Sequence, residues 1–289
     1  MNQKMNCRVL LFLFFCVSVN AGEPMNFKLR KLSQEERSVI EGKGTEKPFS
    51  GKYLSNFEKG VYSCRRCGLG LYRSEDKFKS GCGWPAFEDE LYGAVSRQAD
   101  PDGLRTEILC SRCGAHLGHI FKGEQLSPKN VRHCVNSISL DFIPAEKLGV
   151  AYFAGGCFWG VEYYFINEEG VLHVMPGYMG GGKENPTYKD VCSGKTGHAE
   201  VVMILFDKSI TDFRRLAKLF FEIHDPTQLN KQGPDIGTQY RSEIFFSDDE
   251  QKNIAEELKA ILISRGIKVV TKITKAADFY QAEEYHRRY

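Results

Sequence analysis

Residues 64–68 are Cys-Arg-Arg-Cys-Gly, and residues 110–114 are Cys-Ser-Arg-Cys-Gly. Each stretch is a C-x-x-C knuckle followed by glycine, and the four thiolates of two knuckles form the tetrahedral shell that Zn²⁺ prefers. A reversible dithiol uses the same spacing, so a redox-active pair is the alternative for either knuckle. Two matched knuckles favour one structural zinc ion per chain, with the ligands Cys64, Cys67, Cys110 and Cys113. An ion held by four protein ligands has no open position for chemistry.

The sequence around the knuckles predicts a mainly-β, zinc-containing domain over residues 27–145. This part is rich in Gly, Ser and Cys, with short apolar runs between turn residues. Residues 137–142 alternate apolar and polar side chains, as a half-buried strand does. Ser33 and Glu36 have the spacing of a capping box, which indicates one helix near the start.

From residue 149 onward the pattern changes to strands alternating with helices. Residues 201–206 are an apolar run of strand length, and Asp212 can cap a helix with one apolar face. Ser247 and Glu250 have the spacing of a second capping box. We therefore predict an α/β (α+β layered, ferredoxin-like) domain over residues 149–289. Because the connector between the domains is short, we expect them to touch.

The first 21 residues have the layout of a secretory signal peptide. Lys4 and Arg8 precede an apolar run over residues 9–19, and small residues follow up to Ala21. The run is shorter than the ~20 residues that span a bilayer, and a retained anchor is the alternative. We expect an exported protein, in the periplasm, the cell envelope or outside the cell, with membrane contact only where the segment is retained.

Net charge and cysteine content narrow the function classes. The formal net charge is +2, so there is no general field for polyanions and nucleic acid is not an expected partner. Two of the ten cysteines, Cys7 and Cys16, fall in the presumed signal peptide. The other eight could form a disulfide framework in an exported protein, but the knuckle spacing argues against it.

Two further cysteines of the first domain, Cys82 and Cys134, stand in longer motifs. These are Gly-Cys-Gly-Trp-Pro at 81–85 and Arg-His-Cys-Val-Asn at 132–136. Together with Gly-Thr-Glu-Lys-Pro-Phe-Ser-Gly at 44–51, Gly-Ala-His-Leu-Gly-His at 114–119 and the two knuckles, they occur in the order typical of one family. Residues 30–145 resemble methionine sulfoxide reductase B, which repairs one epimer of oxidised methionine.

The resemblance implies a role for each reactive group. Cys134 attacks the sulfoxide sulfur, and the positive charge of Arg132 favours its thiolate. Cys82 resolves the resulting sulfenic acid as a disulfide. The remaining implied residues are His116 and His119 for proton transfer, Trp84 as a wall for the substrate methyl group and Asn136 as a polar contact. Taken singly, such a Trp is often core and such a His a structural polar residue.

A third reactive cysteine opens the second domain. Cys157 lies in Gly-Gly-Cys-Phe-Trp-Gly at 155–160, where a strand pattern passes into a helix pattern. A thiol at a helix N-terminus meets the dipole and free N–H groups, which lower its pKa. The alternative is an inert buried cysteine beside core aromatics.

That motif has five others behind it in order: Pro-Gly-Tyr at 176–178, Asn-Pro-Thr-Tyr at 185–188, Gly-His-Ala-Glu-Val at 197–201, His-Asp-Pro-Thr-Gln at 224–228 and Gly-Thr-Gln-Tyr-Arg-Ser at 237–242. Residues 150–288 resemble methionine sulfoxide reductase A, which acts on the S epimer where the B type acts on R. The resemblance implies Cys157 as nucleophile and Glu200 as proton donor, its carboxyl pKa raised by burial. It places the hydroxyls of Tyr188 and Tyr240 near the sulfoxide oxygen, Asp235 on the Tyr240 loop, and Phe158 and Trp159 around the methyl group.

The sequence does not show which thiol reduces the Cys157 sulfenic acid. Many A-type enzymes have a resolving cysteine near their C-terminus, whereas the other cysteine of residues 149–289 is Cys192. Cys192 and Cys82 are candidates, and we favour direct attack by an external thiol.

The sequence thus predicts a B–A fusion that reduces both epimers of methionine sulfoxide, free or in proteins. We expect a thioredoxin-like protein or a membrane-derived thiol relay as external reductant, and no organic cofactor. The alternatives are an envelope thiol–disulfide oxidoreductase and a zinc-ribbon nucleic-acid module. The oxidoreductase alternative leaves Trp84, Trp159 and Glu200 without a purpose, and the near-zero net charge and the signal peptide weaken the nucleic-acid alternative.

Overall fold

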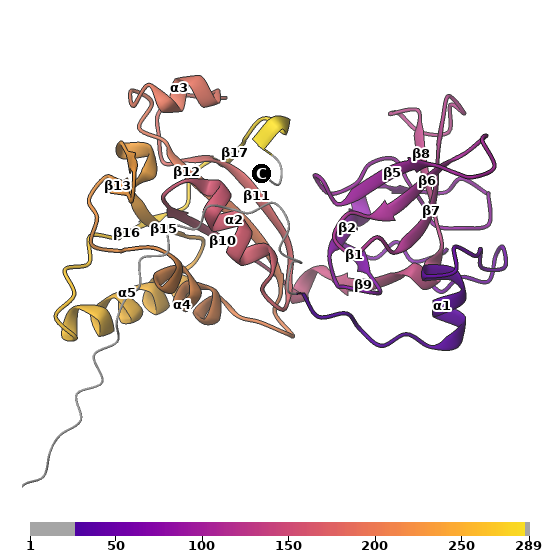
Figure 1. Ribbon diagram of the computed structural model, residues 1–289, viewed down its shortest axis with the longest axis horizontal. Coiled ribbons are helices and arrows are strands. Elements are labelled where there is room, and N and C mark those ends of the chain that lie inside the picture. The colour runs from indigo at the N-terminus through magenta and orange to yellow at the C-terminus, as the bar shows by residue number, and fades with distance from the viewer. Residues whose placement is uncertain (1–26, 287–289) are drawn as a thin grey trace, which may run out of the picture.

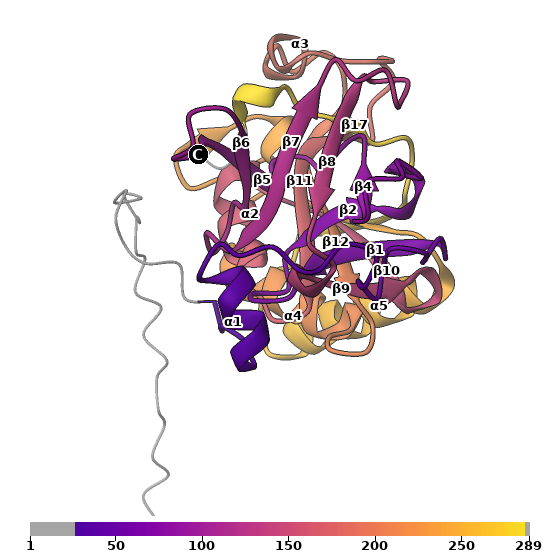
Figure 2. The same ribbon diagram turned by 90° about the vertical axis from the view of Figure 1, so that its right-hand side faces the viewer.

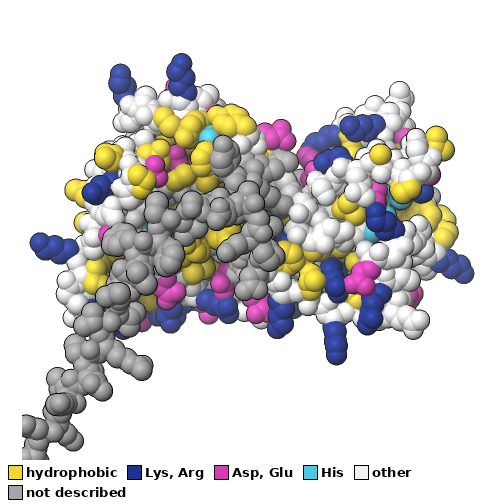
Figure 3. Space-filling view, viewed as in Figure 1, with side chains coloured by type: hydrophobic (Ala, Val, Ile, Leu, Met, Phe, Trp, Pro, Cys, Tyr) yellow, Lys and Arg dark blue, Asp and Glu magenta, His cyan; other side chains and the backbone are white. Residues whose placement is uncertain are grey.

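The computed structural model describes residues 27–286, so the predicted signal peptide, residues 1–21, lies outside the described part. The chain forms two halves that lie side by side (Figure 1). Among the described residues, no helix is both long and apolar enough to cross a membrane. On the face seen in Figure 3, basic and acidic side chains are interspersed, as the near-zero net charge predicts.

The N-terminal half is rich in strands, as predicted. Its elements are α1 (Gln34–Ile40), β1 (Gly60–Cys64), β2 (Gly70–Arg73), β3 (Lys77–Phe78), β4 (Ala86–Phe87), β5 (Val95–Ala99), β6 (Thr106–Cys110), β7 (His116–Lys122), β8 (Val131–Val135) and β9 (Leu140–Pro144). They form a three-stranded sheet in the order β2-β1-β9 and a six-stranded sheet in the order β3-β4-β8-β7-β6-β5, both antiparallel. Figure 2 views the molecule from this half, with β7 and β8 toward the reader.

Local sequence signals predict the start of α1 but not the start of β9. The capping box of Ser33 and Glu36 is confirmed at the start of α1. The predicted strand over residues 137–142 is wrong in its first part, because residues 137–139 form a 3₁₀ turn and β9 begins at Leu140. The carboxylate of Glu46 accepts the backbone N–H groups of Ser137 and Ile138, which withdraws them from strand pairing.

The C-terminal half combines a mixed sheet with helices. Its elements are β10 (Leu148–Gly155), α2 (Phe158–Ile166), β11 (Val171–Met179), α3 (Tyr188–Cys192), β12 (Ala199–Asp207), α4 (Phe213–Ile223), β13 (Lys231–Gln232), β14 (Asp235–Ile236), β15 (Ser242–Phe246), α5 (Asp249–Ser264), β16 (Lys272–Lys275) and β17 (Tyr280–Gln281). The sheet order is β16-β15-β10-β12-β11-β17, with only β15 and β16 parallel, and β13 and β14 form a separate hairpin.

Alternation along β10 decides which face of this sheet is covered by helices. Phe153 stacks on Phe165 of α2 and on Phe213 and Phe220 of α4, while its neighbour Tyr152 packs on the opposite side against Phe279. Successive side chains of a strand point to opposite faces of the sheet, which explains why Phe153 and Tyr152 lie on different faces. β10 and β12 are central strands of this sheet, and Cys157 follows the end of β10 while Glu200 lies at the start of β12.

Two cap predictions for the helices had different outcomes. Asp212 caps α4 as predicted, accepting a hydrogen bond from the backbone of Arg215. The predicted box of Ser247 and Glu250 is wrong by one residue, because Asp248 caps α5 and Gln251 bonds back to the Ser247 N–H. Asp and Ser are equally good N-caps, so the sequence alone does not show whether Ser247 or Asp248 caps the helix.

Candidate active sites

The four knuckle cysteines gather at one point of the N-terminal half. All four sulfur atoms lie within 4.8 Å of one another, with Sγ–Sγ distances of 3.7 Å for Cys64–Cys113 and 3.5 Å for Cys67–Cys110. A tetrahedron with metal–sulfur bonds of ~2.3 Å has sulfur–sulfur edges of about 3.8 Å. The cluster therefore has the ligand type and approximate size of a tetrahedral four-thiolate metal site.

Cys134 and Cys82 form a separate pair of thiols. Cys134 lies on β8 and Cys82 in the loop before β4, and their sulfurs are 3.7 Å apart. The hydrogen bond between them lowers the pKa of Cys82 to about 5 and raises the pKa of Cys134, so the two sulfurs share one proton. Arg132, fixed by an ion pair with Glu124 at 2.7 Å, lowers the pKa of both thiols. One thiolate next to a second thiol is the starting point for attack and disulfide formation.

A bulge in β7 brings His116 and His119 to the same face. The pairing of β7 with β6 passes from Gly118 directly to His116, which leaves Leu117 as the extra residue. Residues three apart in a strand normally point to opposite faces, and the extra residue restores the same one. Gly118 has φ +151°, and a Cβ there would lie 2.0 Å from the Cys134 carbonyl oxygen, so only glycine fits. The two rings are 5.6 Å apart, and His119 pairs across the sheet with Cys134.

Each of these histidines has a carboxylate partner that the sequence did not identify. The Nδ1 of the buried His116 lies 2.6 Å from Glu107, and the Nε2 of His119 lies 2.6 Å from Asp100. Glu107 also accepts hydrogen bonds from Lys43 and Gln98. Burial lowers the pKa of His116, so it stays neutral with its proton on Nδ1. Among the described residues its Nε2 has no hydrogen-bond partner.

Trp84 and Asn136 are fixed by the backbone around Glu46. The Trp84 indole N–H donates to the Glu46 carbonyl at 3.0 Å. The Asn136 amide accepts the Glu46 N–H at 3.0 Å and donates to the Leu117 carbonyl at 3.2 Å. Asn136 is buried, and its amide group thus joins the 44–51 motif to the β7 bulge.

In the C-terminal half, Cys157 is the N-cap of α2 at the end of β10. Gly156 before it has φ +100°, and a Cβ there would lie 2.6 Å from Gln232, so the turn requires glycine. Glu200 on β12 accepts the Phe158 N–H at 3.0 Å through one oxygen, and its other oxygen is buried without a partner among the described residues. Burial raises the pKa of Glu200 to about 7, which suits a proton donor.

The prediction that the helix N-terminus lowers the pKa of the Cys157 thiol is wrong for this state of the site. Burial, followed by the charge of Glu200, raises the pKa of Cys157 to about 11. Hydrogen bonds from the backbone of Trp159 and Gly160 lower the pKa of Cys157, as expected, but their effects are smaller than those of burial and Glu200. Protonation of Glu200 removes the opposing charge, so the acid and the nucleophile of this site are coupled.

The other predicted residues of this half surround the same point. Phe158 contacts Trp159 at 6.1 Å and Tyr188 at 6.4 Å between ring centroids. Burial raises the pKa of Tyr240 to about 12, and smaller contributions from Glu200, Cys192, Asp235 and Cys157 reflect how close these groups lie. Burial also raises the pKa of Asp235. Cys192 is exposed at the end of α3 and hydrogen-bonds with Tyr188.

Two residues near residue 285 belong to this site and were missed. The His286 ring is 1% exposed and packs on Phe158 at 5.0 Å, Trp159 at 5.5 Å and Tyr188 at 4.4 Å. The Glu283 carboxylate accepts the backbone N–H of Tyr188 at 2.8 Å. In the sequence this segment resembles an exposed charged tail, and no local signal distinguishes it.

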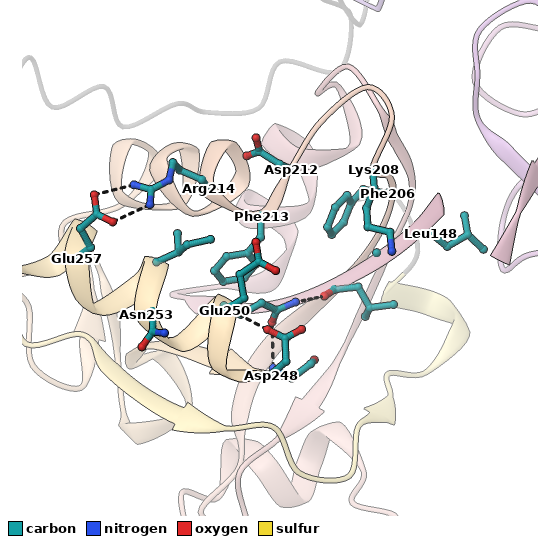
Figure 4. A pocket seen from close by; sticks show the side chains of 15 residues that line it. Leu148, Phe206, Lys208, Asp212, Phe213, Arg214, Asp248, Glu250, Asn253 and Glu257 are labelled. Atoms are coloured by element: carbon teal, nitrogen blue, oxygen red, sulfur yellow. Dashed lines mark hydrogen bonds and ion pairs between the residues drawn. The ribbon is translucent and has the colours of Figure 1, made fainter. Parts of the chain in front are cut away.

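A wide hollow between α4 and α5 contains none of these groups (Figure 4). Charged residues rim it, and Arg214 and Glu257 pair across the two helices at 2.6 Å. Its lining includes neither a cysteine nor any predicted site residue. The hollow is therefore separate from the two thiol sites.

Comparisons with known proteins agree with this division. The family model described as SelR domain matches residues 32–144, and the model described as Peptide methionine sulfoxide reductase matches residues 149–289. Peptide methionine sulfoxide reductase MsrA of Saccharolobus solfataricus is 54% identical over 138 residues, which are 47% of this chain and 78% of the relative. MsrA of Methanothermobacter thermautotrophicus is 52% identical over 142 residues, 48% of this chain and 84% of the relative.

A solved structure resembles the same half. Mxr1 from Saccharomyces cerevisiae in reduced form is 36% identical and covers 50% of this chain and 85% of its own, with a TM-score of 0.48. The two family models cover consecutive parts of the chain and do not overlap. The chain is therefore a methionine sulfoxide reductase of two families, with a SelR (type B) domain first and a peptide methionine sulfoxide reductase (type A) domain second.

Proposed function

We propose that the chain is a bifunctional peptide-methionine sulfoxide reductase, with the R epimer reduced in the N-terminal half and the S epimer in the C-terminal half. The observation that supports it best is that each half has its own cysteine beside its own proton source. His116 and His119 accompany Cys134, and Glu200 accompanies Cys157. The substrates are free methionine sulfoxide or oxidised proteins.

In the N-terminal half, the Cys134 sulfur attacks the sulfoxide sulfur while the histidine pair relays one proton to its oxygen, the unprotonated Nε2 of His116 taking up that proton before passing it on. Methionine leaves, and the oxygen remains on Cys134 as a sulfenic acid. Cys82 then attacks that sulfur, which releases water and forms a disulfide. The 3.7 Å separation of the two sulfurs makes this step local. Trp84 encloses the methyl group and Arg132 stabilises the thiolate.

In the C-terminal half, Glu200 protonates the sulfoxide oxygen, Cys157 attacks the sulfur, and the proton of the Cys157 thiol then returns to the Glu200 carboxylate. The loss of the Glu200 proton creates a carboxylate in a buried place, which a carboxyl with a pKa of about 7 tolerates. Tyr188 and Tyr240 hydrogen-bond the oxygen, with Asp235 beside them, and Phe158 and Trp159 enclose the methyl group. The products are methionine and a sulfenic acid on Cys157.

The four-cysteine cluster holds one structural zinc ion in this proposal. Its sulfur–sulfur distances fit Zn²⁺, and its ligands join the end of β1 to the end of β6. The ion stabilises the first domain and takes no part in the reaction. The ferredoxin-like assignment of the second domain is likewise proposed from its layered sheet and helices.

An external thiol, from a thioredoxin-like protein or a membrane-derived relay, would close both cycles outside the cytoplasm. The signal-peptide pattern of residues 1–21 supports export. The test of the function is an assay of the mature chain with separate R and S substrates and a small dithiol. Turnover of both epimers is expected. Thiol–disulfide exchange without sulfoxide reduction would favour the oxidoreductase alternative.

Recycling of Cys157 is proposed to occur by direct attack of the external thiol on the sulfenic acid. The hydrogen bonds of the Cys157 thiol are to the backbone of Trp159 and Gly160, in contrast to the thiol pair of the first half. A single turnover with the S epimer and no reductant should leave a trappable sulfenic acid on Cys157. Full turnover of Cys192→Ser with a small thiol is expected. A Cys157–Cys192 or Cys157–Cys82 bridge formed within the turnover time would overturn this.

A further inference from the structure

We infer that the N-terminal half completes the S-sulfoxide pocket of the C-terminal half, by holding the segment 283–286 in place through Tyr92. This inference rests on the proposed function of the second site. It gives Tyr92, which lies in the domain for the R epimer, a positioning role in the reduction of the S epimer.

The contact is a hydrogen bond between the two domains. The Tyr92 hydroxyl donates to the Glu283 carbonyl oxygen at 3.2 Å. Tyr92 is well placed for this because its loop is fixed on both sides: the Leu91 N–H bonds to Leu71 of β2, and the Ala94 N–H closes a turn on Leu91. In Figure 1 the chain's final 3₁₀ turn lies on the side of the C-terminal half that faces the N-terminal half.

The side chain of Glu283 connects the contact with Tyr92 to the pocket. Its carboxylate accepts the Tyr178 hydroxyl and the Tyr188 backbone N–H, both at 2.8 Å. Three residues later, His286 packs against Phe158, Trp159 and Tyr188. The segment therefore touches the residues proposed to bind the methyl group, and it contacts the ring and backbone of Tyr188, whose hydroxyl is proposed to bind the oxygen.

The segment has little of its own structure to hold it there. It follows β17, which pairs with β11 over two residues, and consists of a single 3₁₀ turn. Short elements of this kind open at low free-energy cost unless side chains fix them. The Tyr92 contact is thus expected to matter for its position.

Two other contacts between the domains hold the loop with Tyr92 beside the C-terminal half. The Arg112 guanidinium, inside the second knuckle, donates to the Ile166 carbonyl at 2.9 Å, at the end of the helix that begins after Cys157. Gly70 of β2 lies so close to β11 that a Cβ would be 3.1 Å from the Leu172 carbonyl oxygen. The loop with Tyr92 therefore approaches Glu283 from a fixed direction.

The test is Tyr92→Phe in the full chain, which removes one hydroxyl and keeps the ring. KM for the S epimer should rise about fivefold, the size of one net hydrogen bond, with kcat nearly unchanged. Both constants for the R epimer should stay at their wild-type values. Tyr164→Phe, at an exposed position of α2, is the matched control and should change neither reaction.

A second measurement does not depend on activity. The chain has two tryptophans, so Trp84→Phe leaves Trp159 as the sole indole emitter. In that background Tyr92→Phe should shift the Trp159 emission to longer wavelength, because His286 covers the ring less tightly. Unchanged S kinetics together with unchanged emission would overturn the inference, as would equal increases of KM for both epimers. Wild-type turnover of the S epimer, measured first, separates this failure from failure of the proposed function.

Discussion

The two halves solve one chemical problem with different groups. In the N-terminal half the proposed nucleophile has a second thiol 3.7 Å away, and the proposed proton relay consists of two histidines held by carboxylates. In the C-terminal half the proposed nucleophile has backbone N–H groups as its partners, and the proposed proton donor is one buried carboxyl. The difference shows that sulfoxide reduction needs a thiol, an acid and an apolar wall, and that each can be built on an unrelated scaffold.

The largest effect should come from removal of either nucleophile. Cys134→Ser should abolish reduction of the R epimer and spare that of the S epimer, and Cys157→Ser should do the reverse. Loss of a nucleophile in other enzymes lowers kcat by on the order of 10⁶-fold. The assay uses both resolved epimers with each folded variant. If one of these variants lost both activities, the division into two sites would be wrong.

Loss of a zinc ligand should unfold the first half and leave the second half folded. Cys64→Ser or Cys110→Ser should unfold the first half, because structural zinc contributes on the order of 10 kcal/mol to folding. The wild-type chain should contain one zinc ion, and the variants none. S reduction should persist with a raised KM, since the unfolded first half no longer anchors Glu283. A variant that lost R activity with its zinc content intact would contradict this assignment.

Glu200→Gln should affect the second site alone. It keeps the shape of the side chain and the hydrogen bond from Phe158, but it has no proton of suitable acidity to give. Loss of a general acid typically costs ~10²–10⁴-fold in rate. Glu250→Gln, at the exposed start of α5, serves as the control. An S rate within a few-fold of wild type would exclude Glu200 as the proton donor.

Short motifs explain why so much of both sites could be predicted. Cys157 and its glycines, and the knuckles with theirs, fall within a few consecutive residues, so local geometry fixes them. Glu107 and Glu283 could not be found in this way. Glu283 meets Tyr188 across 95 residues of sequence, and its position depends on how β17 and the first domain pack.

The fold shows the same limit. Composition and periodicity predict a strand-rich half and a layered half. They do not show that Asp248 caps α5, nor that β7 has a bulge at Leu117, because both features depend on contacts with residues elsewhere in the fold. The raised pKa of Cys157 is another example. A helix terminus is visible in the sequence, whereas burial and the nearby Glu200 are properties of the folded sheet.

The last predicted effect concerns stability against pH, and here the two halves should behave in opposite ways. Burial raises the folded-state pKa of Glu200 from 4.5 to about 7, so folding favours its protonated form. That stabilisation is complete below pH 4.5 and is lost as the pH rises through 7. It amounts to about 3 kcal/mol at 1.36 kcal/mol for each pH unit. Relative to wild type, Glu200→Gln should therefore gain stability between pH 5 and pH 8.

Glu107 should show the reverse sign. Burial raises its pKa, but hydrogen bonds from Lys43, His116 and Gln98 outweigh burial and leave the pKa below its usual value. Its ionised form is thus favoured by folding, and this stabilisation is present above pH 4.5 and is lost as the pH falls below it. Urea unfolding of wild type, Glu107→Gln and Glu200→Gln at several pH values measures both slopes. Should the two variants differ from wild type by amounts that do not change with pH, the contrast between an ionised structural carboxylate and a neutral catalytic one would not hold.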